Sequence, residues 1–440
     1  MAPARGWLEV GVALLVALTF LGLALPRLDE PQVPLFDEVF HARSGALLAR
    51  GLPPSEVSHP PLLKDAVAVS LALLAPGFEP RAARWAPGEG GGYARDAVWA
   101  WRLPSLLAAA WAVAVAYLLG GALGGGRAAG LAAAALLGLD GCFWVHARAA
   151  QTNVLEASLV LTAVGCAWRA SRGWSFPWLL GAGVAIGLAV ATRWSALVPW
   201  LALGAWLAWG TRGEARAVLR LAGAWVAVPL LVYVAAWLPV LATLHPSGLA
   251  GWGTALVEAQ ATAWGYHARL AEVHPYQSPW WSWPAMARPV WYHFSWRGEV
   301  VTAVWAIGNA VLWWASVPAL IGALRAGWRG QPGLGLVGGL GLAAWVGWVI
   351  APRSLTFMHY YLTVVPLAAI ALGALGFAWW RGRALGGGAA PLQPGAARVV
   401  VIGAACAAVA WRVWYHPLLS AVPVSRAELL QRVWFGEAWL

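Results

Sequence analysis

The chain has 440 residues, of which 61% are hydrophobic and only 11% are charged, and its mean hydropathy is +0.66. A soluble domain carries roughly 25% charged residues, so this composition excludes a wholly water-soluble protein. The net charge of +11 does not indicate a nucleic-acid-binding protein, because the arginines are scattered between apolar segments and form no basic face or arm. The three cysteines lie far apart in apolar stretches, which is typical of buried thiols and not of a disulfide framework or a metal site.

Eleven apolar segments approach the length of about 20 residues that a bilayer-spanning helix needs. They are residues 7–25, 98–119, 128–146, 152–168, 176–192, 194–210, 218–241, 302–324, 334–351, 358–380 and 397–412. Another apolar run, residues 66–75, is too short for a span, and we expect it to form an interfacial or re-entrant helix. The sequence therefore predicts an all-α, multi-pass membrane protein with about eleven transmembrane helices, formed by one integral membrane domain over residues 1–440.

The arginines between the spans predict the orientation, because positively charged loops tend to remain in the cytoplasm. With a cytoplasmic N-terminus, most loop arginines fall on the inner side. Two large loops, residues 26–97 and 243–301, then face outward, as does the C-terminus. The inner segment 382–397 is rich in Gly and Pro, which is typical of a flexible cytoplasmic linker.

The first outer loop contains Asp37-Glu38 and, further on, His59-Pro60-Pro61. Carboxylates just after a membrane exit are well placed to act as a general base. Only one of the two neighbours can point into a given pocket, since adjacent side chains diverge. The alternative is a solvated helix start, because acidic residues favour the first helical turn.

The second outer loop contains His274-Pro275-Tyr276, a tryptophan-rich run that ends at Trp283-Pro284, and Arg288-Pro289. Its tryptophans could form an aromatic belt at the lipid headgroups. Their density among His, Tyr and Arg also suits a pocket for a carbohydrate or a lipid phosphate. Both interpretations remain open on composition alone.

Four arginines lie near the outer ends of predicted helices: Arg102, Arg148, Arg193 and Arg353. A charge near the membrane is costly and is a functional candidate by default. The planar guanidinium also matches the oxygens of a phosphate group. The alternative is a structural ion pair with Asp37, Glu38 or Glu156. Beside Arg353, His359 and Tyr360 could add hydrogen bonds or anchor a helix end.

Taken in order, these segments resemble the protein O-mannosyltransferase family, which belongs to the membrane glycosyltransferases of the C-type (GT-C) fold. The resemblance runs from Phe36 to the C-terminus, and its most specific part is the second outer loop following His59-Pro60-Pro61. Asn153 stands five residues after Arg148, where the family usually has an aspartate. Arg193 stands where the family often has lysine, and the basic residue often found between Ser278 and Pro279 is absent.

The resemblance implies a GT-C architecture and the transfer of mannose from a polyprenyl-phosphate carrier to Ser or Thr hydroxyls of exported proteins, with inversion at the anomeric carbon. Asp37 is the expected general base, with Glu38 as a second candidate or as its positioning residue. The substrate-binding candidates are His59, Arg102, Arg148, Asn153, Arg193, His274, Tyr276, Trp283, Arg288, Arg353, His359 and Tyr360. Among them, Arg102, Arg148 and Arg353 are expected to stabilise the leaving phosphate.

The partners implied are the lipid-linked sugar donor, an exported protein acceptor and membrane lipid, with no metal or other cofactor required and no oligomeric state indicated. The soluble insert of the eukaryotic enzymes is absent, which implies a prokaryotic plasma membrane with the active site on its outer face. One alternative is a related carrier-dependent glycosyltransferase that moves another sugar onto a lipid or glycan acceptor. A transporter or lipid flippase is a distant alternative, because the sequence shows no internal repeat and its distinctive polar residues gather in loops on one side.

Overall fold

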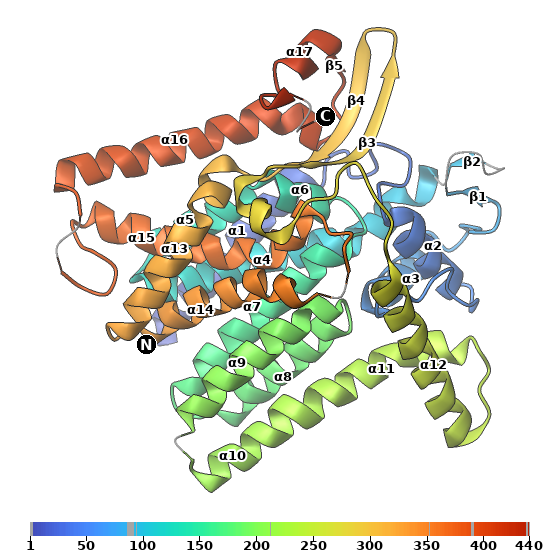
Figure 1. The fold of residues 1–440 in the computed structure, drawn as a ribbon, viewed down its shortest axis with the longest axis horizontal. Helices are drawn as coiled ribbons and strands as arrows, with labels where there is room; N and C mark the ends of the chain where they lie inside the picture. Colours follow the sequence, from blue (N-terminus) through green and yellow to red (C-terminus); the bar gives the residue numbers. More distant parts are fainter. Residues whose placement is uncertain are drawn as a thin grey trace.

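Helices dominate the structure, which is a computed structural model describing residues 3–85, 92–93, 95–211, 213–351, 353–388, 391–436 and 439 (Figure 1). The α-helices are α1 (Pro3–Ala24), α2 (Glu38–Leu48), α3 (Leu62–Leu74), α4 (Val98–Gly124), α5 (Arg127–Gly138), α6 (Gly141–Ala147), α7 (Thr152–Ser171), α8 (Phe176–Val190), α9 (Leu197–Gly210), α10 (Ala215–Ala222), α11 (Val228–Ala242), α12 (Gly248–Arg269), α13 (Ala310–Trp328), α14 (Pro332–Val346), α15 (Val365–Trp380), α16 (Pro394–Leu419) and α17 (Arg426–Leu430).

Short irregular helices and strands join these elements. The former are η1 (Arg95–Ala97), η2 (Trp194–Ala196), the π-helical η3 (Gly223–Ala227), η4 (Trp280–Ala285), η5 (Gly347–Ile350) and η6 (Met358–Thr363). The strands are β1 (Ala83–Arg84), β2 (Gly92–Tyr93), β3 (Val290–Arg297), β4 (Val300–Ala306) and β5 (Val424–Ser425).

Within the described residues, 7 helical segments are long and apolar enough to cross a membrane, or up to 8 if α5 and α6 form one bent span. The helices α8 and α15 are apolar but shorter. The prediction of a mostly helical, multi-pass membrane protein is confirmed, whereas the count of eleven spans is not. The physical reason is that several apolar segments are broken or short. The segment 128–146, for example, bends by 69° between α5 and α6.

The predicted span over residues 302–324 is wrong in its first part. Strand β4 occupies Val300–Ala306, and α13 begins only at Ala310. Four of the β4 residues are β-branched, which favours a strand. Asn309 then caps α13 by accepting a hydrogen bond from the Val311 N–H at 3.2 Å, so the helix starts where its capping residue stands.

The apolar run 66–75 lies in α3, whose 13 residues are fewer than a spanning helix needs. Leu63, Val67 and Leu71 are buried on one face, whereas Val69 and Leu73 are 60% and 74% exposed. The helix is therefore amphipathic, as an interfacial helix would be.

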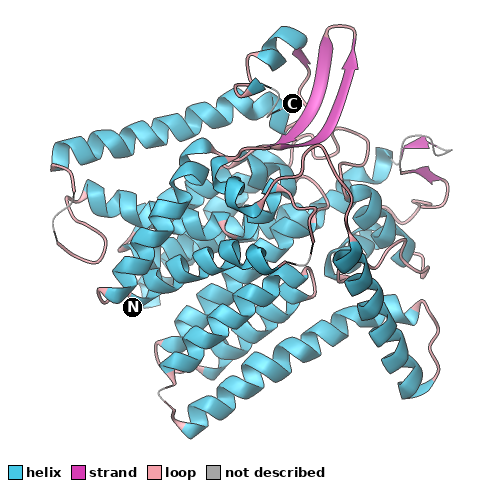
Figure 2. Cartoon of the chain, viewed as in Figure 1, coloured by secondary structure: helices cyan, strands magenta, loops and turns pink. Residues whose placement is uncertain are grey.

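The two segments predicted to be outer loops carry more regular structure than the sequence suggested. The segment 26–97 contains α2 and α3, with residues 86–91 and 94 outside the described part. The segment 243–301 contains α12 and an antiparallel hairpin of β3 and β4, with β5 from the C-terminal tail paired to β4. Figure 2 shows this hairpin projecting from the helices beside the C-terminus. The segment 382–397 contains turns and then the first turn of α16, and its residues 389–390 lie outside the described part.

Asp140 holds the break between α5 and α6 in place. It caps α6 by accepting from the Phe143 N–H at 2.7 Å, and it also accepts from the Asn309 N–H at 2.8 Å and from the indole of Trp313 at 2.6 Å. These hydrogen bonds connect the bend between α5 and α6 to the start of α13. After the bend, the chain continues through α6 to Arg148 and Asn153, at the same end of the bundle as the residues that follow α1.

Candidate functional site

Asp37 is the N-terminal capping residue of α2, but its side chain forms no capping hydrogen bond. The side chain is half-buried, and no described residue donates a hydrogen bond to its carboxylate. The interpretation of Asp37 as an ordinary helix cap therefore does not hold in the structure. Its carboxylate oxygens remain available to another partner.

The neighbouring Glu38 is fully buried, and its carboxylate is saturated. Oε2 accepts from the Leu35 N–H at 2.8 Å, and Oε1 accepts from the Ala150 N–H at 2.7 Å. The guanidinium of Arg102 donates to both oxygens at 3.0 Å. A carboxylate has about four lone-pair sites, so Glu38 has no oxygen left with which to accept a further proton.

Arg102 and Arg148 both bind the chain that leaves α1. Arg102 is fully buried and also donates to the carbonyls of Leu28 at 3.0 Å and Val33 at 2.9 Å. Arg148 donates to the carbonyls of Ala24, Pro26 and Arg27. The four carboxylate and carbonyl contacts of Arg102, like the three carbonyl contacts of Arg148, fix the backbone that carries Asp37.

Arg193 and Arg353 instead converge on the ring of Tyr360, with guanidinium carbons 4.6 and 5.5 Å from its centroid. Arg193 donates to Thr152 Oγ1 at 3.1 Å and to Asn153 Oδ1 at 2.9 Å. Arg353 donates to the Leu355 carbonyl at 2.7 Å. These are the two arginines whose charge acts on Asp37.

Asn153 connects Arg193 to the segment before α15. Its amide nitrogen donates to the His359 carbonyl at 3.3 Å, while its oxygen accepts from Arg193. The Asn153 side chain is neutral and forms no ion pair with Arg193. Among the described residues, the carboxylate that pairs with Arg193 is that of Glu156, at 3.4 Å. Two residues that depart from the family pattern, Asn153 and Arg193, are thus in direct contact.

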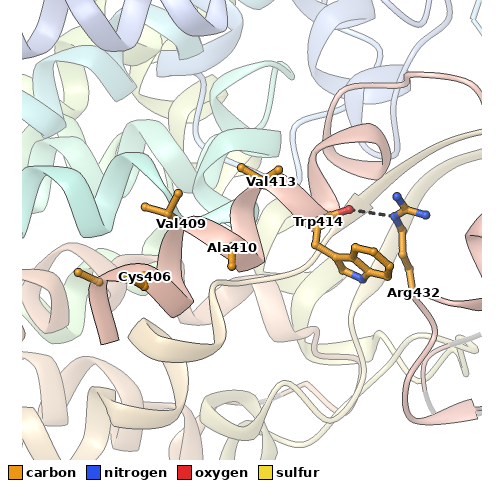
Figure 3. Close-up of a pocket in the computed structure, with 7 residues that line it drawn as sticks. Cys406, Val409, Ala410, Val413, Trp414 and Arg432 are labelled. Atoms are coloured by element: carbon orange, nitrogen blue, oxygen red, sulfur yellow. Dashed lines mark hydrogen bonds between the residues drawn. The ribbon is translucent and has the colours of Figure 1, made fainter. Parts of the chain in front are cut away.

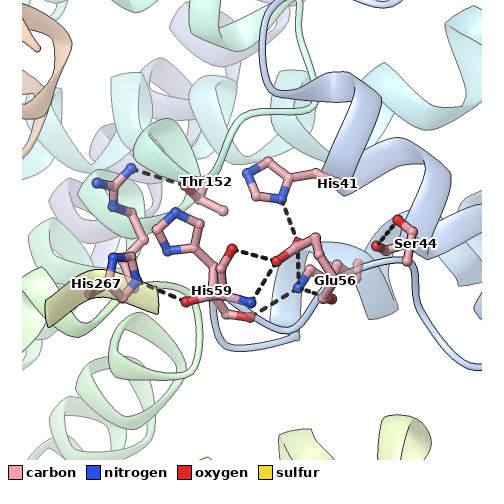
Figure 4. A network of polar contacts seen from close by, with 10 residues as sticks. His41, Ser44, Glu56, His59, Thr152 and His267 are labelled. Atoms are coloured by element: carbon pink, nitrogen blue, oxygen red, sulfur yellow. Dashed lines mark hydrogen bonds and ion pairs between the residues drawn. The ribbon is translucent and has the colours of Figure 1, made fainter. Parts of the chain in front are cut away.

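Three histidines, His41, His59 and His267, lie near one another beside Glu56 (Figure 4). The ring centroids of His41 and His59 are 5.6 Å apart, and those of His59 and His267 are 5.1 Å apart. Lys64, the one lysine of the chain, donates to the carbonyls of Glu56 and His59, both at 3.0 Å, and pairs with the Glu56 carboxylate. This buried ammonium therefore shapes the loop that presents His59.

The hydrogen bonds of His267 define its tautomer. Its Nδ1 must accept from Arg353, 3.2 Å away, so the proton is on Nε2, which donates to the Ser58 carbonyl at 2.8 Å. Burial and the positive charge of Arg353 lower the pKa of His267 to about 4. Burial also holds the pKa of His59 well below its ordinary value, with Arg193 adding to the effect. Both imidazoles are neutral at physiological pH.

The second outer loop contributes an aromatic wall more than a surface belt. Trp283 is fully buried and packs against Trp348 and Tyr360, with ring centroids 5.4 and 6.1 Å away. The His274 ring faces Phe36, and its Nδ1 accepts from the Tyr276 N–H at 3.1 Å. Arg288 donates to the Pro275 carbonyl at 2.6 Å. Tyr276 and Arg288 therefore help to fold the loop that carries His274.

Phe36, which directly precedes Asp37, has a φ of +45°. A bulky residue adopts this left-handed conformation only when its surroundings impose it. The Phe36 ring stacks on Tyr292 with centroids 4.7 Å apart, and its N–H donates to the Tyr292 carbonyl at 3.3 Å. The buried His359 ring packs edge-on with the Phe36 ring, and their centroids are 5.7 Å apart. This aromatic cage fixes the direction in which the chain enters α2.

The position of Asp37 raises its basicity. Burial raises the pKa of the Asp37 carboxyl above its ordinary value, and electrostatic interactions with His41, Arg193 and Arg353 offset only part of that effect. Of the residues that the sequence analysis did not select, His41 was the easiest to find, because it lies four residues after Asp37 on the same helix face. Nothing in the sequence order joins Glu56, His267 or Tyr292 to Asp37.

Among the described residues, no group of three or more His, Cys, Asp or Glu side chains could hold a metal ion.

Family models and curated relatives that match this chain are all protein mannosyltransferases. The family model described as dolichyl-phosphate-mannose-protein mannosyltransferase matches residues 14–245, more than half of the chain, and the model of the C-terminal four-transmembrane region of protein O-mannosyltransferase matches residues 253–327. The polyprenol-phosphate-mannose–protein mannosyltransferase of Mycobacterium tuberculosis is 25% identical over 99% of this chain and 91% of the relative. The enzyme of the same name from Mycolicibacterium smegmatis is 23% identical over 98% of this chain and 92% of the relative.

Solved structures share the fold. The Saccharomyces cerevisiae protein O-mannosyltransferase Pmt1-Pmt2 complex bound to the sugar donor gives a TM-score of 0.80 at 13% identity and covers 100% of this chain and 93% of that chain. ArnT from Cupriavidus metallidurans gives a TM-score of 0.53 at 18% identity and covers 96% of this chain and 75% of that chain. The predicted GT-C architecture is confirmed.

The buried pair of Glu38 and Arg102 generates a stability prediction. Replacing Arg102 with methionine leaves an unpaired carboxylate in the interior, and we expect the free energy of unfolding to fall by about 3–5 kcal/mol. Replacing both residues, as in the E38M/R102M variant, removes both charges and should cost less than the single change. Thermal unfolding in detergent measures this, with Asp96→Ala at an exposed position as the control. Equal stability of the Arg102→Met variant and the wild type would contradict the prediction.

Proposed function

The chain belongs to the dolichyl-phosphate-mannose-protein mannosyltransferase family and is a multi-pass membrane glycosyltransferase, and from this premise we propose that it transfers mannose from a polyprenyl-phosphate carrier to Ser or Thr hydroxyls of exported proteins. The observation that carries the proposal is the free, partly buried carboxylate of Asp37 beside a saturated Glu38. We place the reaction at the outer face of a prokaryotic plasma membrane, in line with the bacterial relatives.

Asp37 acts as the general base. A Ser or Thr hydroxyl is a weak nucleophile at neutral pH, so Asp37 takes its proton as the hydroxyl oxygen attacks C1 of the sugar. Attack from the face opposite the phosphate inverts the anomeric carbon, and no covalent intermediate with the protein is needed. Glu38 positions Asp37 through Arg102 and the Leu35 N–H and does not itself take the proton.

Arg193 and Arg353 stabilise the leaving phosphate. Both act on the charge at Asp37, and both retain guanidinium N–H groups without an acceptor among the described residues. Fixed N–H groups in a region of low dielectric stabilise developing negative charge more strongly than water does. Arg102 and Arg148, also considered for this role, are better described as anchors of the α1 exit because backbone carbonyls and Glu38 occupy them.

The sugar and the acceptor lie between the histidines and the aromatic wall. Neutral His59 offers one hydrogen-bond donor and one acceptor, which suits sugar hydroxyls, whereas both ring nitrogens of His267 are used by Arg353 and the Ser58 carbonyl, so His267 contributes its ring face. His274 and Tyr360 supply ring faces and edges near Asp37. Asn153 holds Arg193 without adding a second carboxylate to the one of Glu156, and the Arg193 N–H groups that have no described acceptor face the phosphate.

Substitution of Asp37 tests its role as the general base. Asp37→Asn should lower sugar transfer by about 10²–10⁴-fold, because that is the usual contribution of general-base catalysis. The assay uses purified protein, polyprenyl-phosphate-mannose and a Ser/Thr-rich peptide, with Asp96→Asn as the matched control at an exposed carboxylate of the same loop. Near-normal transfer by Asp37→Asn would remove Asp37 from the mechanism. No transfer by wild-type protein that binds the lipid would point to a different sugar or acceptor, which mass spectrometry of the native glycans would identify.

The raised pKa of Asp37 predicts the pH dependence of transfer. The base works only when deprotonated, so activity should be present above its pKa and lost as pH falls through it. Because burial raises this pKa, the acid limb of kcat/KM should lie above the ordinary aspartate value of about 3.9. A profile of kcat/KM against pH in detergent measures the midpoint. An acid limb at or below the ordinary value would contradict the assignment.

The two sets of arginines should respond differently to substitution. Arg353→Gln is expected to lower kcat/KM by about 10²-fold, as loss of one transition-state donor does, while the protein stays folded. Arg148→Gln should mainly lower the midpoint of thermal unfolding, since it leaves three backbone carbonyls without a donor. Arg269→Gln, at an exposed position, is the control for lost charge. Unchanged transfer by Arg353→Gln would exclude it from phosphate binding.

A further inference from the structure

A second group of basic side chains lies where the exit of α1, the end of α6 and the end of α16 meet. It consists of Arg27, Arg148, Arg412 and His416 around the indole of Trp144, and we call it the Arg412 cluster. The Arg412 guanidinium lies 4.0 Å from the Trp144 ring centroid, and that of Arg148 lies 5.8 Å from it. Arg27 donates to the Ala421 carbonyl at 3.1 Å, which ties the α1 exit to the segment after α16.

The cluster carries excess positive charge. Among the described residues, none of its members forms an ion pair with a carboxylate. Two carboxylates act on the cluster without pairing with it: Asp29 acts on Arg148, and Asp140, which acts on Arg412, already accepts from Phe143, Asn309 and Trp313. Three arginines therefore still outnumber the nearby carboxylates. An uncompensated charge at the edge of a membrane is costly, so a site of this kind favours an anion.

The unused hydrogen-bond donors define what the cluster can bind. Arg412 is only 9% exposed, and its one described acceptor is His416 Nδ1 at 2.8 Å. Because Nδ1 accepts, the proton of a neutral His416 is on Nε2, which has no described partner. Arg27 is exposed and uses one carbonyl. Arg148 spends its donors on carbonyls and adds only its charge. The remaining N–H groups of Arg412, His416 and Arg27 suit the oxygens of a phosphate.

This cluster is distinct from the proposed catalytic site. The charges that act on Asp37 belong to His41, Arg193, Glu56 and Arg353, and no member of the Arg412 cluster is among them. The phosphate of the sugar donor must lie beside the sugar carbon that Asp37 serves. A phosphate at the Arg412 cluster therefore belongs to another molecule.

An apolar surface continues from the cluster along α16. Only 17% of the apolar window of this helix is buried, and Ile402, Val409 and Val413 are 51%, 48% and 68% exposed. Val409 is three residues before Arg412 and seven before His416, so all three share one helix face. Figure 3 shows a groove on this helix, where Cys406, Val409, Ala410 and Val413 lead to Trp414 and to Arg432, which donates to the Trp414 carbonyl at 2.9 Å. The exposed side chains of Val409 and Val413 thus lie within one helical turn of Arg412 and His416, respectively, on α16, while the groove itself ends at Arg432.

We propose that the Arg412 cluster binds the phosphate of an anionic phospholipid whose acyl chains lie along the exposed face of α16. The cationic donors match the headgroup, and the apolar stripe of a spanning helix matches the chains. The proposal does not depend on the transfer reaction.

The test compares two lipids in the full-length protein. The purified protein is placed in nanodiscs containing equal amounts of phosphatidylglycerol and phosphatidylcholine, extracted, and examined by native mass spectrometry for retained lipid. We expect the wild type to retain phosphatidylglycerol preferentially and Arg412→Gln to reduce that retention by about tenfold, as the loss of a charge-assisted contact does. Arg27→Gln, at an exposed position, should reduce it as well. Arg398→Gln, at the opposite end of the same helix, should leave it unchanged.

Equal retention of the two lipids by the wild type would overturn the proposal, as would unchanged phosphatidylglycerol retention in both variants. Arg27→Gln keeps the test valid if Arg412→Gln fails to fold. In a separate arm, inorganic phosphate is added to lipid-free protein in detergent. A rise in the thermal midpoint that requires Arg412, without any preference for phosphatidylglycerol, would assign the site to free phosphate and also overturn the lipid proposal. Neither sugar donor nor acceptor is present, so the result is independent of the proposed function.

Discussion

The buried contact between Glu38 and Arg102 is the constraint on which the geometry around Asp37 depends. It joins the start of α2 to α4, and the further hydrogen bonds of both side chains reach the α1 exit and the loop after α6. A pair of charges with no exposure to water persists only when most of the remaining lone pairs and N–H groups are satisfied, and here Glu38 accepts four hydrogen bonds and Arg102 donates four. The saturation of one carboxylate leaves its neighbour free. Of the two adjacent acidic residues, one is thus a buried structural support and the other keeps an unpaired carboxylate.

The arginines at this end of the bundle also fall into a structural pair and a pair near Asp37. Arg102 and Arg148 bind the backbone that leads to Asp37, whereas Arg193 and Arg353 meet at Tyr360 near the carboxylate itself. The imidazoles of His59 and His267 are neutral and add no charge there. The region therefore places the unpaired carboxylate of Asp37 near two arginines and several aromatic and imidazole rings.

The helical membrane class and the family could be predicted from the sequence, whereas the number of spans and the hydrogen bonding of the site residues could not. Apolar length and arginine placement predicted a multi-pass helical protein, and the order of short motifs predicted its family. The number of spans could not be predicted, because the polar residue Asp140 breaks one apolar run and the β-branched run at Val300 begins as a strand. From the sequence, Asp37 was expected to be the base and Glu38 a second candidate or a positioning residue, but the hydrogen bonding of the two could not be predicted. Which of them is saturated depends on backbone N–H groups at Leu35 and Ala150, and N–H groups carry no sequence signature. The same holds for Arg148, whose partners are all carbonyls.

The pairing of β4 with β5 has a consequence for how the protein can be handled. Strand β4 lies between β3 and β5, so its outward edge is covered by the tail, and Trp439 adds a hydrogen bond from its indole to the Met286 carbonyl. Shortening the tail before Val424 would uncover that edge and present unpaired N–H and carbonyl groups to any neighbouring chain. Fusion partners and purification tags are therefore better attached at the N-terminus, and deletions at the other terminus invite self-association through an exposed strand.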